Sequence, residues 1–519
     1  MNGRWIAQLL AAPAWVGALL TVVVSARGEP VTPWNEAGVV DTARSPHAVL
    51  RAVPIRAVTM EPGFWRPKME ANRTVSIPRL LKLLEEKGVV DNFRRLSGRK
   101  QCERRGYYFT DSDLYKWMES AALALQSADD PAVKADLDRI IDEVLAIQGS
   151  DGYINTWFEG PKAKDRFKQL PSHHELYCAG HLFQAAVAHY RATGERKLLD
   201  GALRFADYLV NVFGPDKPFQ GFDGHPEVEM ALVELYRTTG KQGYLELAEY
   251  YLDGNGYARR KGVEGHAVRM MYLCCGATDF FAETGREDYQ QASLALWQDM
   301  VAGKLYVTGG VGARGSGEAF GEPFELPNRT AYSETCASIA NGMWNWRMLA
   351  VTGEAKYMDL FERVLYNAFL SGVSIQGGEY FYVNPLANDG RHRRRDWYDC
   401  TCCPPNVQRT MAAIPGHVFT TSDKGVQVHL YDNCVLKWKL ADGTPLVLRQ
   451  KTSYPWDGAV EIDVAPQTAR TFDLDLRIPG WCRKPALKVN GQPVGMELKP
   501  GTYARVSREW KTGDRAELT

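Results

Sequence analysis

The sequence predicts an α+β multidomain protein in which an (α/α)6 barrel is followed by a β-sandwich. Three features of the 519 residues support this prediction. Apolar residues recur with a period of about 3.6 as far as residue 372, which is typical of amphipathic helices. From residue 373 the period changes to about two, which is typical of half-buried strands. Glycines that end helical patterns, Gly194, Gly240 and Gly285, recur 46 and 45 residues apart, as expected for repeated helical hairpins.

The first 53 residues are predicted to precede the folded domains. Residues 1–26 contain one charge, Arg4, then an apolar run and small residues at 24–26, which predicts a cleaved export signal. Because the run is nearly long enough to span a bilayer, a membrane anchor is the alternative. Residues 27–53 show no sustained period and are interpreted as a linker of little structure. We therefore expect an exported protein, periplasmic or secreted, without membrane contact after cleavage.

Residues 54–372 are interpreted as the barrel. A fourth glycine stop, Gly353, continues the hairpin pattern. Such hairpins form an open solenoid or a closed toroid, and the period alone does not choose between them. His174, His225 and His266 stand at similar places in successive repeats, each near the start of a helical segment. Equivalent hairpin ends meet around one mouth only if the array closes, so we favour the closed barrel.

Residues 373–519 are interpreted as a junction loop with a cysteine cluster, followed by the sandwich. Alternating runs, for example at 460–464 and 472–478, are separated by turn signals such as the Asp-Gly pair at 442–443 and the Asn-Gly pair at 490–491. This pattern is typical of a β-sandwich. The sequence stops within an alternating pattern, so we expect a truncated sandwich.

Three of the ten cysteines, Cys400, Cys402 and Cys403, lie directly before a pair of prolines. The prolines restrict the backbone, so we expect an irregular, stiff loop on which both adjacent sulfurs face one ion. Glu334 and Cys336 would complete a set of three thiolates and one carboxylate, which zinc accepts. The spacing matches no common zinc signature, so a disulfide or buried thiols remain alternatives on chemistry alone.

Nine short motifs from about residue 55 to the end carry a family resemblance. They are YDCTCCPPN at 398–406, GEAF at 317–320, LPN at 326–328, SETCAS at 333–338, DSDLYKW at 111–117, SHHELY at 172–177, DGHPE at 223–227, GHAVR at 265–269 and RIPGW at 477–481. Together they resemble glycoside hydrolase family 127, the zinc-dependent β-L-arabinofuranosidases. The resemblance implies an (α/α)6 barrel as catalytic domain, a glycosidase activity and a bound zinc ion.

The resemblance also implies roles for individual residues. Cys402 would be the nucleophile and Glu318 the general acid/base of a retaining exo-glycosidase, in place of the usual two carboxylates. Zinc would remove the thiol proton of Cys402 and leave a thiolate at neutral pH. The zinc ligands would be Glu334, Cys336, Cys402 and Cys403. The residues at the sugar would be His174, His225, His266 and Tyr382, with Cys400 close by.

The predicted partner is an oligosaccharide or glycan substrate. Equal numbers of basic and acidic residues, 62 of each, argue against a nucleic-acid partner. Two other functions remain open. One is an exported carbohydrate-binding protein with a structural zinc, and the other is a sugar epimerase or lyase on the same toroid. Binding alone needs no acid at Glu318, whereas hydrolysis requires one. The sugar, the linkage, the aglycone and the oligomeric state are not predicted.

Overall fold

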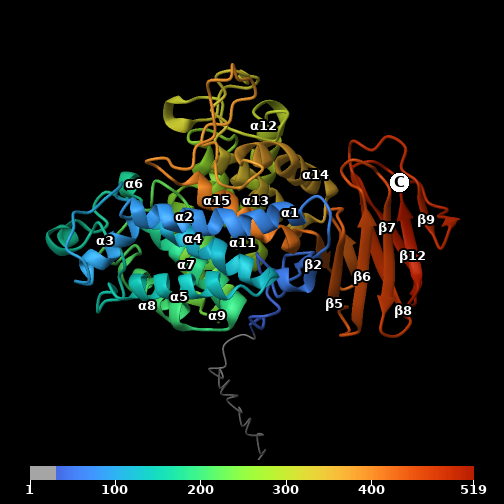
Figure 1. Cartoon of the computed structure of the whole chain (residues 1–519), viewed down its shortest axis with the longest axis horizontal. Helices are drawn as coiled ribbons and strands as arrows, with labels where there is room; N and C mark the ends of the chain where they lie inside the picture. The colour runs from blue at the N-terminus through green and yellow to red at the C-terminus, as the bar shows by residue number, and fades with distance from the viewer. Residues whose placement is uncertain (1–30) are drawn as a thin grey trace, which may run out of the picture.

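The computed structural model describes residues 31–519, and the predicted signal at 1–26 lies outside them. Figure 1 shows a helical part beside a pair of β-sheets. Six helices, called here the ring helices, each contact the next, and the last contacts the first, so the contacts close into a ring. The ring helices are α4 (Asp111–Ser127), α7 (Glu175–Thr193), α9 (Val228–Thr239), α11 (Ala267–Thr284), α13 (Thr335–Thr352) and α15 (Cys403–Ala413).

Six outer helices each pack against at least one ring helix. Their apolar residues lie on one side, so only that side is buried. In α8, for example, Leu198, Phe205 and Leu209 are buried. The outer helices are α2 (Ile77–Glu86), α5 (Pro131–Leu145), α8 (Lys197–Val212), α10 (Gln242–Gly254), α12 (Glu287–Gly303) and α14 (Ala355–Arg363). Three short helices are α1 (Arg66–Ala71), α3 (Val89–Leu96) and α6 (Leu170–His173).

The cysteine motif does not form the irregular loop that its prolines predicted. Cys403 begins α15, and Pro404 and Pro405 occupy its first turn, where a missing backbone N–H costs no helical hydrogen bond. Helix α15 packs against α4 and α13. The helical part therefore continues beyond residue 372, and the junction loop ends at Cys402.

Two β-sheets form the second part of the molecule, and the runs at 460–464 and 472–478 lie in strands as predicted. The five-stranded sheet has the order β1 (Arg51–Ala52), β3 (Phe419–Thr421), β4 (Gly425–Val428), β8 (Arg470–Ile478), β11 (Thr502–Trp510). The seven-stranded sheet has the order β10 (Gln492–Pro493), β9 (Leu487–Val489), β12 (Asp514–Leu518), β7 (Val460–Pro466), β6 (Pro445–Thr452), β5 (Cys434–Lys439), β2 (Val58–Met60). Neighbouring strands are antiparallel except for β4 and β8.

The predicted linker has no helix or strand between residues 31 and 50, but it is packed into the fold. The N–H groups of His47 and Val49 donate to the carbonyl groups of Ala282 and Ala350, at 3.0 and 2.9 Å. These carbonyls lie near the C-terminal ends of α11 and α13. We call residues 31–50 the base segment, because it closes one end of the ring.

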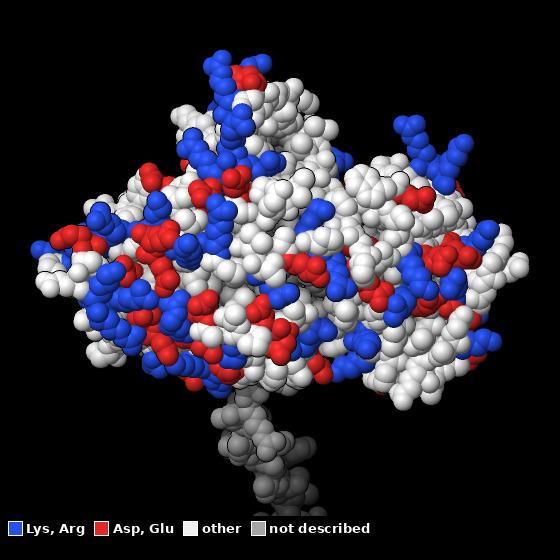
Figure 2. Space-filling model, viewed as in Figure 1, with Lys and Arg blue, Asp and Glu red and all other residues white. Residues whose placement is uncertain are grey.

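The surface carries both signs of charge. Figure 2 shows basic and acidic side chains interspersed over one face of the molecule, in keeping with their equal numbers in the sequence. Across residues 31–519, no helix combines the length and the hydropathy that crossing a bilayer demands.

Candidate active site

The predicted site residues gather at the N-terminal ends of the ring helices. His174, His266, Glu334 and Cys402 are the N-cap residues of α7, α11, α13 and α15. His225 lies three residues before α9. The first N–H groups of a helix lack partners within it and carry partial positive charge. This end of the ring, called here the mouth, therefore favours thiolate and carboxylate groups.

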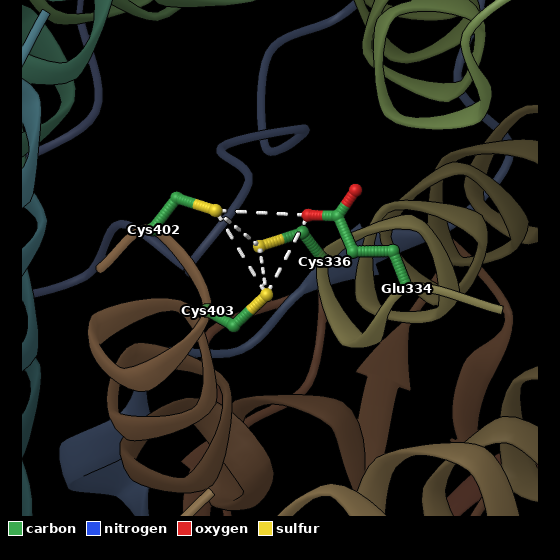
Figure 3. Close-up of side chains that lie close together, drawn as sticks. All are labelled: Glu334, Cys336, Cys402 and Cys403. Atoms are coloured by element: carbon green, nitrogen blue, oxygen red, sulfur yellow. Dashed lines mark hydrogen bonds between the residues drawn. The ribbon is translucent and has the colours of Figure 1, made fainter. Parts of the chain in front are cut away.

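Glu334, Cys336, Cys402 and Cys403 form one cluster, in which the four side chains point toward one another (Figure 3). The Sγ atom of Cys336 lies 3.6 Å from that of Cys402 and 3.1 Å from that of Cys403. The Sγ atoms of Cys402 and Cys403 are 3.9 Å apart, and Oε1 of Glu334 lies 3.6 and 3.5 Å from them. All ten cysteines are free, so the structure does not support the disulfide alternative.

The donor set of this cluster fits a tetrahedral zinc ion. Ligands about 2.0–2.3 Å from zinc lie about 3.3–3.8 Å from one another in a tetrahedron. The five separations above run from 3.1 to 3.9 Å. The second carboxylate oxygen of Glu334 is buried without a hydrogen-bond partner among residues 31–519, a cost that a cation would offset. Three sulfur donors favour zinc over calcium or magnesium.

Polar neighbours stabilise negative charge on the sulfur of Cys336. Burial acts to raise the pKa of the Cys336 thiol, but its hydrogen bonds with Cys402 and Cys403 outweigh burial and lower the pKa to about 7. The Nδ2 group of Asn406 donates to Sγ of Cys336 at 3.0 Å. Lys116 is fully buried, and its Nζ donates to the carbonyl oxygen of Cys402 at 3.1 Å. The cluster is thus surrounded by donors and one cation.

Glu318 lies beside this cluster on a short 3₁₀ turn, Ser316–Glu318. Its φ of 51° is in the left-handed region, which a glutamate adopts only under strain. Its Oε2 lies 3.0 Å from Nε2 of His266, and its Oε1 accepts a hydrogen bond of 2.8 Å from Tyr332. Burial opposes ionisation, but the hydrogen bond and charge of His266 lower the pKa of Glu318 to about 2. Ligand atoms of His266, Glu318 and Glu334 all lie within 4.8 Å of one another.

The three predicted histidines form a row across the mouth. The ring centroids of His174 and His225 are 5.2 Å apart, and those of His225 and His266 are 5.6 Å apart. Burial, assisted by the charge of Arg269, lowers the pKa of His174 to about 4. Burial also lowers the pKa of His225 well below its usual value. These two rings are therefore neutral at pH 7. Nδ1 of His174 donates to the carbonyl of Ser172 at 2.7 Å and Nδ1 of His225 to that of Pro226 at 3.2 Å, so each ring has Nε2 left to accept from a sugar hydroxyl.

Tyr382 and Cys400 face the same mouth from the junction loop. The Tyr382 hydroxyl lies 3.9 Å from Sγ of Cys400, and its ring centroid lies 6.3 Å from that of Tyr332. The Tyr382 carbonyl accepts from the N–H of Thr335 at 3.0 Å, which ties the loop to the start of α13. The structure thus brings together the residues that the sequence and the family resemblance predicted for the site.

Two buried charged residues that hold the site were not assigned a role from the sequence. Asp223 accepts hydrogen bonds from the N–H groups of Leu176 and Tyr177, at 2.8 and 3.0 Å, and from that of His225 at 2.9 Å. It therefore caps α7 and fixes His225 beside that helix. Lys116 holds Cys402, as described above. Both lie within the motifs of the family resemblance, but sequence alone does not distinguish a buried lysine from an exposed one.

Two protein-family models match the chain. Residues 57–416 match the model described as "Beta-L-arabinofuranosidase, GH127 catalytic domain". Residues 425–519 match the model described as "Beta-L-arabinofuranosidase, GH127 middle domain". The first match includes α15 and ends directly before β3.

Characterised relatives and solved structures agree with these matches. A non-reducing end β-L-arabinofuranosidase of Bifidobacterium longum subsp. longum is 35% identical over 471 residues, which cover 79% of this chain and 71% of the relative. A GH127 β-L-arabinofuranosidase structure from Geobacillus stearothermophilus T6 is 37% identical, with a TM-score of 0.85 over 89% of this chain and 81% of that one. The GH127 β-arabinofuranosidase BT3674 is 36% identical, with a TM-score of 0.87 over 91% and 80% of the two chains.

Proposed function

The chain belongs to glycoside hydrolase family 127, and on this premise we propose that it releases L-arabinofuranose from the non-reducing ends of β-linked arabinofuranosides. Family membership makes the protein a glycoside hydrolase, which leaves no observation in favour of the binding-protein or epimerase alternatives. The names of the relatives support the sugar and the exo mode of action. We also infer that the ring helices and outer helices are the two layers of an (α/α)6 barrel, supported by the closed order of their contacts.

The observation that carries the proposed mechanism is that Cys402 and Glu318 both lie beside Glu334 at the mouth. In the first step, Sγ of Cys402 attacks the anomeric carbon while the glycosidic C–O bond breaks, and Glu318 gives its proton to the leaving oxygen. In the second step, Glu318 takes a proton from water, whose oxygen attacks the same carbon and breaks the C–S bond. Two displacements on opposite faces retain the anomeric configuration.

Glu318 must carry a proton in the first step, whereas in the free site its pKa is lowered to about 2. The two groups that hold it ionised, His266 and Tyr332, are also the nearest proton donors. A sugar that binds between these groups would displace their contacts with Glu318 and exclude water. Loss of this pairing raises the pKa of Glu318 toward the range needed for an acid.

The zinc ion would be held by Glu334, Cys336, Cys402 and Cys403. The separations of these four residues and the unpaired oxygen of Glu334 support this assignment. Bound zinc would keep Cys402 deprotonated at neutral pH and hold it in place. We expect metal analysis of the purified protein to find about one zinc per chain. Protein without metal that retains full activity would contradict this assignment.

Product stereochemistry and covalent trapping test the mechanism together. We expect NMR of the first-formed product to show retained configuration, and an electrophilic furanose analogue to label Cys402. Peptide mapping then identifies the labelled residue. An inverted product, or a label on Glu334 with Cys402 free, would contradict the cysteine mechanism and favour an ordinary pair of carboxylates.

We further propose that the enzyme is exported, on the basis of the sequence of residues 1–26. Mass spectrometry of the mature N-terminus tests this proposal. A mature chain that still begins at Met1 and is found in the cytosol would contradict it.

A further inference from the structure

A groove lies between the helical part and the sandwich, and none of its lining residues belongs to the candidate active site. Its volume is about 560 Å³. One wall comes from α14 and the residues after it, and the other from the loops that follow β6 and β8. The second of these loops contains the end of the RIPGW motif, for which the proposed mechanism has no use. The lining side chains include Phe64, Asp359, Glu362, Tyr366, Trp456 and Trp481.

Two indole rings stand exposed at this groove. Trp456 is 83% exposed and Trp481 is 60% exposed, and no other tryptophan among residues 31–519 is classed with the exposed residues. Exposed indole rings are unfavourable in water, so two of them at one groove mark a binding surface. Another aromatic ring lies beside each indole, and of these two rings Tyr454 is buried and Phe64 is half-buried. Phe64 lies 6.0 Å from Trp456 and Tyr454 lies 6.2 Å from Trp481, measured between ring centroids.

Fixed polar groups lie between the aromatic rings. Arg477 is fully buried and pairs with Asp359 at 2.5 Å and with Glu362 at 2.8 Å. The Tyr454 hydroxyl donates to Glu362 at 2.5 Å. These contacts hold two carboxylates in place. Glu362 is buried, whereas the side chain of Asp359 is 19% exposed and keeps lone pairs that can accept further hydrogen bonds. Arg363 is exposed at the same groove and makes no ion pair within residues 31–519, so its donors are available to a ligand.

We propose that this groove is a second carbohydrate-binding site, which holds a sugar residue of the glycan away from the active site. A sugar ring has an apolar C–H face that packs on an indole and hydroxyl groups that bond to carboxylate and guanidinium groups, and the groove presents both kinds of partner. Its volume lies within the range of small-ligand pockets, about 300–1,000 Å³. The choice of an arabinose-containing glycan rests on the proposed function, whereas the existence of the site does not.

Affinity electrophoresis in native gels tests this proposal. Every protein in this test also carries Glu318→Gln, so that the polysaccharide is not degraded during the run. The probes are soluble arabinan, arabinoxylan and hydroxyethylcellulose. We expect arabinan to retard the protein, and Trp456→Ala or Trp481→Ala to weaken binding about tenfold, the loss of one apolar contact. Trp438→Ala, the same change on β5 outside the groove, should leave retardation unchanged.

Measurements of hydrolysis distinguish a failure of the proposed function from a failure of the second binding site. With Glu318 intact, Trp456→Ala should cleave a small chromogenic arabinofuranoside at the wild-type rate, because the groove does not contribute to the mouth, but should act more slowly on polymeric arabinan. If neither the wild type nor Trp456→Ala cleaves the chromogenic substrate, the proposed function is wrong. The gel test still decides whether the groove binds a polysaccharide. Absence of retardation in all three polysaccharides, or retardation unaffected by both tryptophan changes, overturns the second site. A dimer in sedimentation that either tryptophan change dissociates also overturns it and identifies an interface between copies.

Discussion

The two ends of the ring helices are built differently. At the mouth, the N-cap residues of α7, α11, α13 and α15 are His174, His266, Glu334 and Cys402, and none of them makes a side-chain capping hydrogen bond. At the base, α7, α9, α11 and α13 each end in a glycine in the left-handed conformation, with φ between 70° and 75°. Each of these glycines donates its N–H to a carbonyl of the last helical turn.

The same contrast holds for the surrounding loops. At the mouth, His174, Glu318 and Ser333 adopt positive φ values of 55°, 51° and 38°, and Oε2 of Glu334 and Nδ1 of His266 have no hydrogen-bond partner within residues 31–519. At the base, backbone groups of the base segment pair with the ends of α11 and α13. Backbone strain at non-glycine residues is thus found at the mouth, the end for which we propose the chemistry, whereas the helices at the base end in glycines that adopt the left-handed region without strain.

The largest expected effect is the loss of kcat when Cys402, the proposed nucleophile at the mouth, is replaced. Cys402→Ser should lower kcat by at least about 10⁴-fold, because a serine hydroxyl is not ionised at neutral pH. Thermal unfolding should remain cooperative, since the base is untouched. The measurement is steady-state kinetics on a chromogenic arabinofuranoside.

Two further cysteine variants complete this experiment. Cys482→Ser changes a half-buried free cysteine of the sandwich and should keep wild-type activity. Cys403→Ser should lose metal, and the trapping reagent should never label position 403. A Cys402→Ser enzyme with wild-type kcat would remove the cysteine from the mechanism.

The next effect concerns the acid. Glu318→Ala should lower turnover of natural substrates by roughly 10²–10⁴-fold, the usual contribution of a positioned acid/base. Substrates with good leaving groups should lose less in the first step, because they do not need protonation. Glu325→Ala, in the segment that follows and paired with Arg314, should keep its activity. Equal losses on activated and natural substrates would show that Glu318 only positions the sugar.

The base of the ring could be predicted from the sequence more fully than the arrangement of the mouth. A glycine that ends a helix satisfies a local requirement of the backbone, so Gly194, Gly240 and Gly285 were recognisable from their regular spacing, and Gly353 from the helical pattern that it ends. The strands were recognisable for the same reason, because a period of two is local. The base segment was not, since its place depends on helix ends far away in the sequence.

The four candidate zinc ligands at the mouth could be predicted from residue chemistry and the family resemblance. The backbone geometry that brings them together could not. Pro404 and Pro405 predict a loop through their effect on the preceding residue, but prolines are equally compatible with the first turn of a helix, which these two occupy. Lys116 and Asp223 hold the site through contacts with distant residues, which no local pattern reveals. The sequence and the family resemblance thus indicated which side chains gather at the mouth and left open which side chains hold them there.

A smaller effect should appear in the dependence of stability on pH. Burial lowers the pKa of His174 from 6.5 to about 4 in the folded protein. As the pH falls from 7 to 5, the unfolded chain takes up a proton that the folded protein does not, so stability is lost. The expected loss from this residue is about 2 kcal/mol. His174→Asn, which tolerates the left-handed backbone, should remove this part of the dependence in urea unfolding at the two pH values.

A matched change of an exposed histidine provides the control for this measurement. His47→Asn in the base segment should leave the pH dependence of unfolding as it is in the wild type. If His174→Asn and the wild type lose the same free energy between pH 7 and 5, His174 is not held neutral by the mouth.

The smallest effect is expected at the base, where two glycines offer a matched pair. A Cβ atom on Gly194 would meet the ring of Trp34 at 2.9 Å, whereas one on Gly353 would meet only Cγ2 of Val49, at an ordinary 3.4 Å. Both substitutions force alanine into the left-handed region, at about 1 kcal/mol each. Gly194→Ala should therefore lower the free energy of unfolding by more than Gly353→Ala, because Trp34 must also shift. Neither should change kcat, since both lie at the end of the ring opposite the mouth. Urea unfolding and steady-state kinetics of the two variants test both statements, and a fall in kcat for either would show that the two ends of the ring are coupled.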